Sequence, residues 1–139
     1  MIHRLAQIPA FDAPAVIERV QTTEQAAWLS RANRARQVQP EYFLPHSPLR
    51  QYMAMIDHEV VGWVRSIRVD DATWCADMFV APSFRRRGIA RAMLSRMLVD
   101  DRSLGSQTAV LLAGHAGAML YPVVGYEQIG TLLLFHPGK

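Results

Sequence analysis

Cysteine and long apolar runs are scarce in this chain of 139 residues. Its single cysteine, Cys75, excludes an intramolecular disulfide and a cysteine-based metal site. No apolar run approaches the ~18 residues that span a bilayer. The first 14 residues have no apolar stretch of signal-peptide length. We therefore expect a cytoplasmic protein without a membrane partner.

Lysine is scarce too, because Arg supplies fourteen of the 15 cationic residues. With 12 acidic residues the formal charge is +3, which is mildly basic. The five His residues show no metal-ligand spacing, so no metal is expected. The length predicts a single domain over 1–139, with 1–14 as a lead-in. The 50% hydrophobic content predicts a packed core.

Hydrophobic patterning predicts the order β-α-β-β-β-α-β-α-β after one short strand within 2–8. The expected strands are 16–20, 51–56, 60–69, 73–80 and 108–113, with 126–135 as a final strand or short hairpin, and the expected helices are 22–33, 87–101 and 116–123. Segment 36–48 reads as a loop or irregular helix. The short connections among the three central strands indicate antiparallel hairpins. The fold class is therefore α+β (mixed α/β).

The stretch 80–90 is the most informative, because a strand ends there, three Arg follow and a helix begins at Gly88. Helix N-termini expose about four unpaired amides and attract phosphate. Gly88 and Ala90 leave room for a phosphate to approach, and Arg side chains add bidentate contacts. These residues predict a phosphate site, with a solvated basic helix start as the alternative. Walker and Rossmann motifs are absent.

Two blocks carry a resemblance to a known family. The sequence Arg85-Arg86-Arg87-Gly88-Ile89-Ala90 is similar to the Gln/Arg-x-x-Gly-x-Gly/Ala acetyl-CoA signature of the GNAT superfamily of N-acetyltransferases, and Val80-Ala81-Pro82 resembles its Val-x-Pro lead-in. Residues 120–126 resemble the family's Leu-Tyr-x-x-x-Gly-Phe, with Tyr in place of Phe. The resemblance covers about residues 16–135. It implies a GNAT-like fold: a mostly antiparallel twisted sheet, helices on both faces and a V-shaped strand splay at the CoA site.

The resemblance also implies the activity, which is direct transfer of an acetyl group from acetyl-CoA to a primary amine of a small molecule, peptide or protein. Backbone amides of residues 85–90 would hold the CoA pyrophosphate. The strand end at Met78, Phe79 and Val80 would pair with the pantetheine arm. Tyr121 would be the general acid for the departing thiolate. Its alternative role is a buried ring that packs a helix onto the sheet.

The general base is less well defined. Asp77 is the best candidate for a base or substrate-binding role, because many family members carry an acidic residue three positions before the Val. Strand alternation places Asp77 on the opposite face from Met78, away from the cofactor. A structural hydrogen-bonding role for Asp77 is the alternative. Glu41, His46 and Glu59 are weaker candidates for the base.

Several residues depart from the family pattern. Gly114 and His115 stand where the family often has Asn, and Arg86 stands where Gly is common. Only 14 residues follow Gly125, where most members build two strands. The sheet is then completed by one strand or by a strand from a partner subunit, which makes a homodimer a hypothesis. Cys75 is expected to be a buried, inert thiol, since the family transfers the acyl group directly.

Two other functions stay open at this point. A non-catalytic acyl-CoA-binding sensor or regulatory module would keep the phosphate site and lose the chemistry. A nucleic-acid binder would use Arg85–Arg87, but it would need more basic positions along one face and exposed aromatic residues. Cations and acids are mixed elsewhere in the chain, so no nucleic-acid partner is expected.

Overall fold

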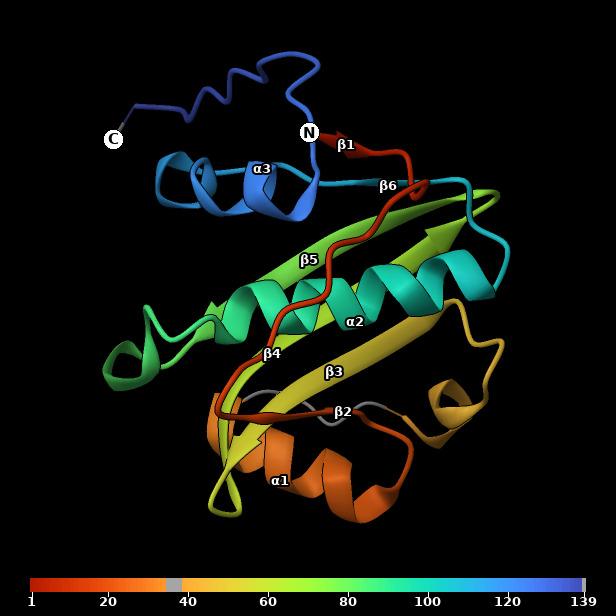
Figure 1. The fold of residues 1–139 in the computed structure, drawn as a ribbon, viewed down its shortest axis with the longest axis vertical. Helices are drawn as coiled ribbons and strands as arrows, with labels where there is room; N and C mark the ends of the chain where they lie inside the picture. The colour runs from red at the N-terminus through yellow and green to blue at the C-terminus, as the bar shows by residue number, and fades with distance from the viewer. Residues whose placement is uncertain (35–38, 139) are drawn as a thin grey trace.

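The computed structural model describes residues 1–34 and 39–138 (Figure 1). In these ranges six strands form one sheet in the order β1-β6-β5-β4-β3-β2. The strands are β1 (Ile2–His3), β2 (Val16–Arg19), β3 (Leu49–Ile56), β4 (Glu59–Val69), β5 (Ala72–Val80) and β6 (Thr108–Val110). Each neighbouring pair is antiparallel except β5 and β6, which are parallel. The predicted α+β class and mostly antiparallel sheet are confirmed.

Helices cover both faces of this sheet, as predicted. The helices are α1 (Thr23–Asn33), α2 (Ile89–Ser103) and α3 (Leu120–Val124), and the 3-10 turns are η1 (Pro40–Phe43), η2 (Pro82–Phe84) and η3 (His115–Gly117). On β3, Tyr52 and Ala54 belong to the core cluster that contains the buried face of α2. Met53 lies between them and packs with the α1 residues instead. Because alternate strand residues face opposite sides, α1 and α2 lie on opposite faces.

Local sequence accounts for both long helices. The Thr22 hydroxyl accepts a hydrogen bond of 3.1 Å from the Gln25 amide and caps α1. The predicted stripe of α2 is buried, with Met93 and Met97 fully enclosed. The helix α2 begins at residue 89, two residues later than predicted, because Arg86 and Gly88 have φ values of +63° and +78°. Such backbone is left-handed and outside helical geometry.

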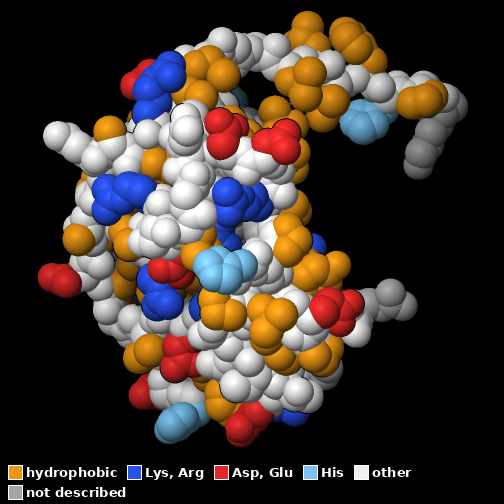
Figure 2. Space-filling model, turned by 90° about the vertical axis from the view of Figure 1, so that its right-hand side faces the viewer, with side chains coloured by type: hydrophobic (Ala, Val, Ile, Leu, Met, Phe, Trp, Pro, Cys, Tyr) orange, Lys and Arg blue, Asp and Glu red, His pale blue; other side chains and the backbone are white. Residues whose placement is uncertain are grey.

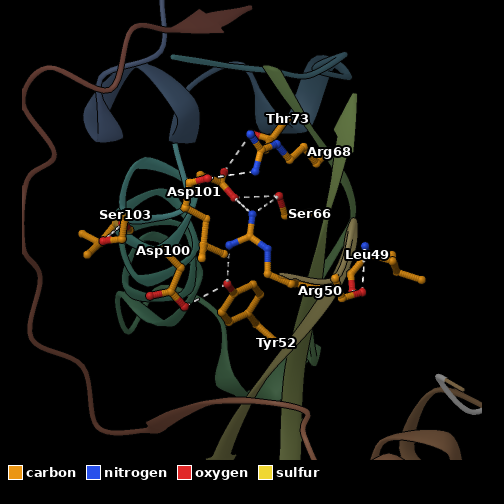
Figure 3. A network of polar contacts seen from close by, with 12 residues as sticks. Leu49, Arg50, Tyr52, Ser66, Arg68, Thr73, Asp100, Asp101 and Ser103 are labelled. Carbon is orange, nitrogen blue, oxygen red and sulfur yellow. Dashed lines mark hydrogen bonds and ion pairs between the residues drawn. The ribbon is translucent and has the colours of Figure 1, made fainter. Parts of the chain in front are cut away.

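A buried polar network joins the C-terminal end of α2 to the sheet (Figure 3). Asp101 of α2 forms an ion pair with Arg50 of β3, and both side chains are at most 1% exposed. The Asp101 carboxylate also accepts hydrogen bonds of 2.8 Å from the hydroxyls of Ser66 on β4 and Thr73 on β5. Asp101 of α2 thereby bonds to side chains of three strands, β3, β4 and β5.

Strands β5 and β6 separate soon after they meet. Their pairing covers only Ala72–Trp74 and Thr108–Val110. Beyond Trp74, this edge of β5 has no strand beside it in the described chain, up to Val80. The V-shaped splay predicted from the family resemblance is confirmed, and it leaves backbone groups of β5 free to bind a ligand.

The two ends of the chain differ from the sequence prediction. The expected strand within 2–8 is shortened to Ile2–His3, and the expected strand 108–113 to β6. The final strand or short hairpin predicted at 126–135 is wrong, because in the described part of the chain this segment forms a single bridge, from Glu127 to Ile2. β1 takes the place beside β6, and among the described residues Glu127 is the one position of this segment that bridges to the outer edge of the two-residue β1. Of the predicted loop 36–48, residues 36–38 lie outside the described residues.

Candidate active site

A cavity of about 910 Å³ opens between the C-terminal half of β5, the start of α2 and α3. Its size lies within the usual range for small-molecule sites. The predicted residues that line it are Met78, Phe79, Val80, Arg85, Arg86, Arg87, Gly88, Ile89, Ala90 and Tyr121. Ten of the eleven predicted site residues therefore come together around one cavity. The exception is Asp77.

The start of α2 presents free amides to this cavity. The first helical hydrogen bond runs from the Ala92 amide to the Gly88 carbonyl, at 3.1 Å. The amides of residues 89–91 therefore have no helical carbonyl to bind, and they carry the positive end of the helix dipole. Gly88 suits this position because its φ of +78° is left-handed, where a residue with a Cβ is strained.

Four arginines surround the same opening, and three of them rest on aromatic rings. Arg85 donates from Nε to the Val80 carbonyl at 2.8 Å. Its guanidinium lies 5.6 Å from the centre of the Phe79 ring. Arg87 lies over Phe84 at 5.5 Å, in the same kind of cation–π contact. The arginines themselves are exposed, so further donors stay available for an anion.

The sequence analysis missed Arg91, which also lines the cavity. It lies three residues after Gly88, on the helix face that points toward the glycine, and its guanidinium is 4.9 Å from the Phe11 ring. Helical spacing from Gly88 could have found it. The other missed lining residues come mostly from η3 and α3, namely Phe84, Gly114, Gly117, Leu120 and Val123. Leu120 and Val123 lie within the 120–126 block, whereas Phe84 and Gly117 carry no motif that would single them out.

Tyr121 reaches the cavity from α3. Its ring packs edge-on against Tyr126, with 5.7 Å between ring centres, and only 9% of the residue is exposed. A Cβ on Gly117 would lie 2.6 Å from the Tyr121 ring, so a glycine there makes room for it. Burial, with a smaller contribution from Cys75, raises the pKa of Tyr121 to about 12. Its phenol therefore keeps its proton at neutral pH.

Asp77 lies at a β-bulge. Trp63 of β4 pairs with Phe79, whereas Arg65 pairs with Ala76, so Asp77 and Met78 share one position on the facing strand. Asp77 has a φ of +56°, which is unusual for a residue with a side chain. The bulge breaks the regular alternation that the sequence analysis assumed.

The side chain of Asp77 pairs with Arg65 on β4, and Asp77 is not among the residues that line the cavity. Its Oδ2 lies 3.1 Å from the Arg65 guanidinium, and about half of the Asp77 side chain, 46%, is exposed. The two strands meet here only a few residues from Phe79, which does line the cavity. Asp77 therefore sits beside the cavity, within an ion pair that solvent can reach.

The weaker candidates for the base lie elsewhere. Glu41 is on η1 and His46 follows that turn, while Glu59 begins β4; all three are exposed and none lines the cavity. Figure 1 shows η1, before β3, and the η2 loop, after β5, at opposite ends of the strands. Cys75 is buried, and burial raises the pKa of its thiol to about 12. A thiol in that state is a poor nucleophile, as predicted.

In the described ranges, no cluster of three or more His, Cys, Asp or Glu side chains gathers in a way that could hold a metal ion. Within the same ranges, none of the helices has the length and apolar character needed to cross a bilayer.

Comparisons with known proteins agree with this geometry. The sequence model of the acetyltransferase (GNAT) domain matches residues 48–128. A comparison with curated protein sequences finds no match. Among solved structures, an aminoglycoside N-acetyltransferase, AAC(6')-Iy, in complex with CoA is similar, with a TM-score of 0.66 at 18% identity over 89% of this chain and 100% of that one.

Two further structures extend the likeness. A predicted acetyltransferase with acetyl-CoA from Clostridium acetobutylicum has a TM-score of 0.67 at 16% identity, covering 88% of this chain and 96% of its own. A ribosomal-protein-alanine N-acetyltransferase from Brucella melitensis biovar Abortus 2308 has a TM-score of 0.62 at 17% identity, covering 89% and 99%. At these identities the similarity shows a shared fold.

The fold and the matched domain define an acyltransferase. The chain belongs to the GNAT acetyltransferase family, since the domain match covers more than half of its length.

Proposed function

We propose that this chain is an N-acetyltransferase that moves an acetyl group from acetyl-CoA directly to a primary amine. The observation that carries the proposal is the cavity itself, which is bounded by free helix amides, four arginines, an open strand edge and one protonated tyrosine. Each of these features can interact with one part of acetyl-CoA: the pyrophosphate, the pantetheine arm or the thioester. The proposal names acetyl-CoA as cosubstrate and gives no role to a metal.

The pyrophosphate end would lie at the start of α2. The amides of residues 89–91 and the helix dipole favour an anion there. Arg86, Arg87 and Arg91 can add charge-assisted hydrogen bonds, whereas Arg85 already donates to the Val80 carbonyl. Because α2 fixes the direction of these amides, binding of an anion there requires little reorganisation of the backbone.

The pantetheine arm would pair with the open edge of β5. The Ala81 amide donates to Val61 of β4, and strand groups alternate in direction, so the Val80 backbone faces the splay. The accepted hydrogen bond from Arg85 to the Val80 carbonyl agrees with this direction. An amide on this edge, at Met78 or Val80, would stabilise the negative charge that develops on the thioester oxygen.

Tyr121 would give a proton to the departing thiolate. Its pKa of about 12 keeps the phenol protonated across the physiological range, which is the state that a proton donor needs. The packing of its ring against Gly117 and Tyr126 limits its motion. A buried tyrosine with only a packing role would not need to line a cavity built for an anion.

Asp77 would receive the ammonium of the acceptor, and it is our candidate for the group that removes its proton. The carboxylate is accessible and lies at the bulge, near the strand end that lines the cavity. An incoming ammonium would compete with Arg65 for the same oxygen. Glu41, His46 and Glu59 stay as alternative bases, and Asp77→Asn distinguishes them from Asp77.

The first experiment is calorimetric titration of the protein with acetyl-CoA, using pantetheine and free adenosine as controls that lack the pyrophosphate. We expect micromolar binding that requires the pyrophosphate. An absence of binding by folded protein would contradict the proposal. An amine panel follows, including aminoglycosides and peptides that begin with alanine, because similar structures are named for these substrates.

Turnover in that panel separates an enzyme from a module that only binds acyl-CoA. For the base, we compare Asp77→Asn with Asp71→Asn, which changes an exposed aspartate at the β4–β5 turn. Loss of a general base lowers kcat by about 10²-fold or more. An equal kcat for the two variants would remove Asp77 from the mechanism.

A further inference from the structure

Residues 4–15, which we call the N-terminal strap, cross α2 between β1 and β2. They form no helix or strand, and in Figure 1 they are the red trace that passes over α2. The Ser95 hydroxyl of α2 donates a hydrogen bond of 2.6 Å to the Pro9 carbonyl. Nearer the C-terminal end of the helix, the Arg102 guanidinium donates to the Leu5 carbonyl at 3.5 Å. The strap is therefore attached to α2 at two points.

The strap runs antiparallel to α2 and brings Phe11 to the start of that helix. The Phe11 ring centre lies 4.9 Å from the Arg91 guanidinium. Ser95 is four residues after Arg91, so both contacts lie on one face of the helix. Ile8 and Phe11 are partly buried and pack against the main core cluster. The place of the Phe11 ring is thus set by packing and by hydrogen bonds further along the strap.

The cavity at the start of α2 is cationic. Arg85, Arg86, Arg87 and Arg91 line it, and in the described chain no Asp or Glu does. Figure 2 shows the side of the molecule that is on the right in Figure 1, away from the η2 loop, and there Arg side chains lie among acidic ones. An anion is therefore attracted to the cavity more strongly than to that side.

The Arg91 guanidinium lies where the proposed pyrophosphate would bind. A Cβ on Gly88 would lie 2.9 Å from Arg91 Nε, so the guanidinium is beside the residue that precedes the free helix amides. Arg91 has no hydrogen bond or ion pair in the part of the chain that the structure describes. Its contact with Phe11 occupies no acceptor atom, so the N–H donors of Arg91 stay available for a phosphate.

Phe11 affects how freely Arg91 can move. Arg91 is exposed, and fixing an exposed arginine against a ligand costs side-chain conformational entropy. The contact with the Phe11 ring restricts the guanidinium before the ligand arrives, so less entropy is lost on binding. Phe11 does not itself line the cavity. Its effect on a ligand therefore passes through Arg91.

We propose that the N-terminal strap is part of the acetyl-CoA site, and that Phe11 is a positioning residue that holds the Arg91 guanidinium toward a phosphate of the cosubstrate. This inference rests on the proposed function, because it requires acetyl-CoA in the cavity. The pyrophosphate and the 3′-phosphate of CoA share the chemistry that an arginine recognises. The experiment distinguishes between these two phosphates.

The test is calorimetric titration of the full chain and its variants with acetyl-CoA. Phe11→Leu should raise Kd by about 3-fold, the scale of an exposed cation–π contact. Arg91→Gln should raise Kd by about 10-fold or more, the scale of a charge-assisted hydrogen bond. Added to Arg91→Gln, Phe11→Leu should change Kd by less than about 1.5-fold, because the ring then has no guanidinium to hold. Phe11→Trp keeps an aromatic ring and should bind as the native chain does.

Two matched controls make the same changes away from the cavity. Phe43→Leu alters a half-buried phenylalanine of η1, and Arg31→Gln removes an exposed charge from α1; both should keep the native Kd. Acetyl-dephospho-CoA, which lacks the 3′-phosphate, is titrated in parallel. An Arg91→Gln effect that persists with this compound assigns Arg91 to the pyrophosphate, and an effect that disappears assigns it to the 3′-phosphate.

Circular dichroism establishes that each variant is folded. If Phe11→Leu does not fold, Phe11→Met repeats the test, because its flexible side chain fills a similar space without a ring. An unchanged Kd in the folded Phe11 variant, or an undiminished effect of that variant when Arg91→Gln is also present, would overturn the role of Phe11 and leave the proposed function standing. An absence of acetyl-CoA binding by the folded native chain would overturn both.

Discussion

At the residue scale, Tyr121 is both nearly buried and part of the cavity wall. A residue with only a packing role would not need both properties. Burial raises the pKa of Tyr121 to about 12, and the residue still forms part of the wall of an open cavity. Its position depends on Gly117, since a side chain there would collide with the ring. A phenol that is held in place and already protonated before the reaction can donate its proton directly.

Replacement of that hydroxyl gives the first prediction. Tyr121→Phe should slow acetyl transfer by about 10²-fold or more while acetyl-CoA affinity is retained, because only the proton donor is lost. Steady-state kinetics and calorimetry measure the two quantities. Tyr42→Phe, on η1 and away from the cavity, is the matched control. Unchanged turnover in Tyr121→Phe would exclude the hydroxyl from the mechanism.

Gly88 gives the second prediction. Gly88→Glu should abolish acetyl-CoA binding, because a carboxylate would stand where the helix amides attract phosphate. Gly88→Ala serves as the control. It destabilises the left-handed backbone by about 1 kcal/mol but adds no charge. Calorimetry and circular dichroism would be run on both. Tight binding by folded Gly88→Glu would locate the pyrophosphate elsewhere.

Asp77 shows why single-residue roles are harder to predict than motifs. Its choice as an acidic candidate depended only on its position three residues before Val80. Side chains alternate between faces only in a regular strand, whereas β5 has a bulge and a left-handed φ at Asp77. A bulge depends on how two strands pair, so no pattern within β5 alone reveals it.

At the scale of elements, His3 joins the N-terminal strand to α3. Its Nδ1 accepts a hydrogen bond of 2.9 Å from the Leu5 amide, so the proton is on Nε2, which donates to the Val124 carbonyl at 3.0 Å. The ring is buried, and burial lowers its pKa below 6.5. Gly125 follows at a φ of +110°, where a Cβ would lie 2.7 Å from Nε2. β1 thereby fixes the helix that carries Tyr121.

This arrangement predicts a pH dependence of stability. The folded protein holds His3 neutral, so its stabilisation is complete above the unfolded pKa of about 6.5 and decreases as pH falls toward the lower folded value. His3→Gln should lower the free energy of unfolding by about 1 kcal/mol at pH 7.5. The difference from the native protein should shrink at about pH 5.5.

Urea unfolding at several pH values measures this difference. His58→Gln, at an exposed turn residue, should leave the free energy of unfolding nearly unchanged. A difference between His3→Gln and the native protein that stays constant with pH would mean that His3 contributes by packing alone.

At the scale of the whole molecule, the Arg50–Asp101 pair links residues far apart in the sequence (Figure 3). A buried charge without its partner is expensive, so Asp101→Asn should lower the free energy of unfolding by about 3–5 kcal/mol. Denaturant unfolding measures the change, with the exposed Asp71→Asn as control. A loss below about 1 kcal/mol would mean that Arg50 finds water or another acceptor.

The chain by itself determined the features that local physics controls. The cap at Thr22, the apolar stripe of α2 and the glycine that begins this helix all act over a few residues, and the GNAT signature at 85–90 depends on the same local geometry. The tertiary structure decided what depends on competition between distant segments. β1 occupies the edge of β6 and leaves segment 126–135 a bridge at Glu127 on its outer side, and strand pairing produces the bulge at Asp77. One sheet edge can satisfy the backbone of only one neighbour, and that choice is made by the folded chain as a whole.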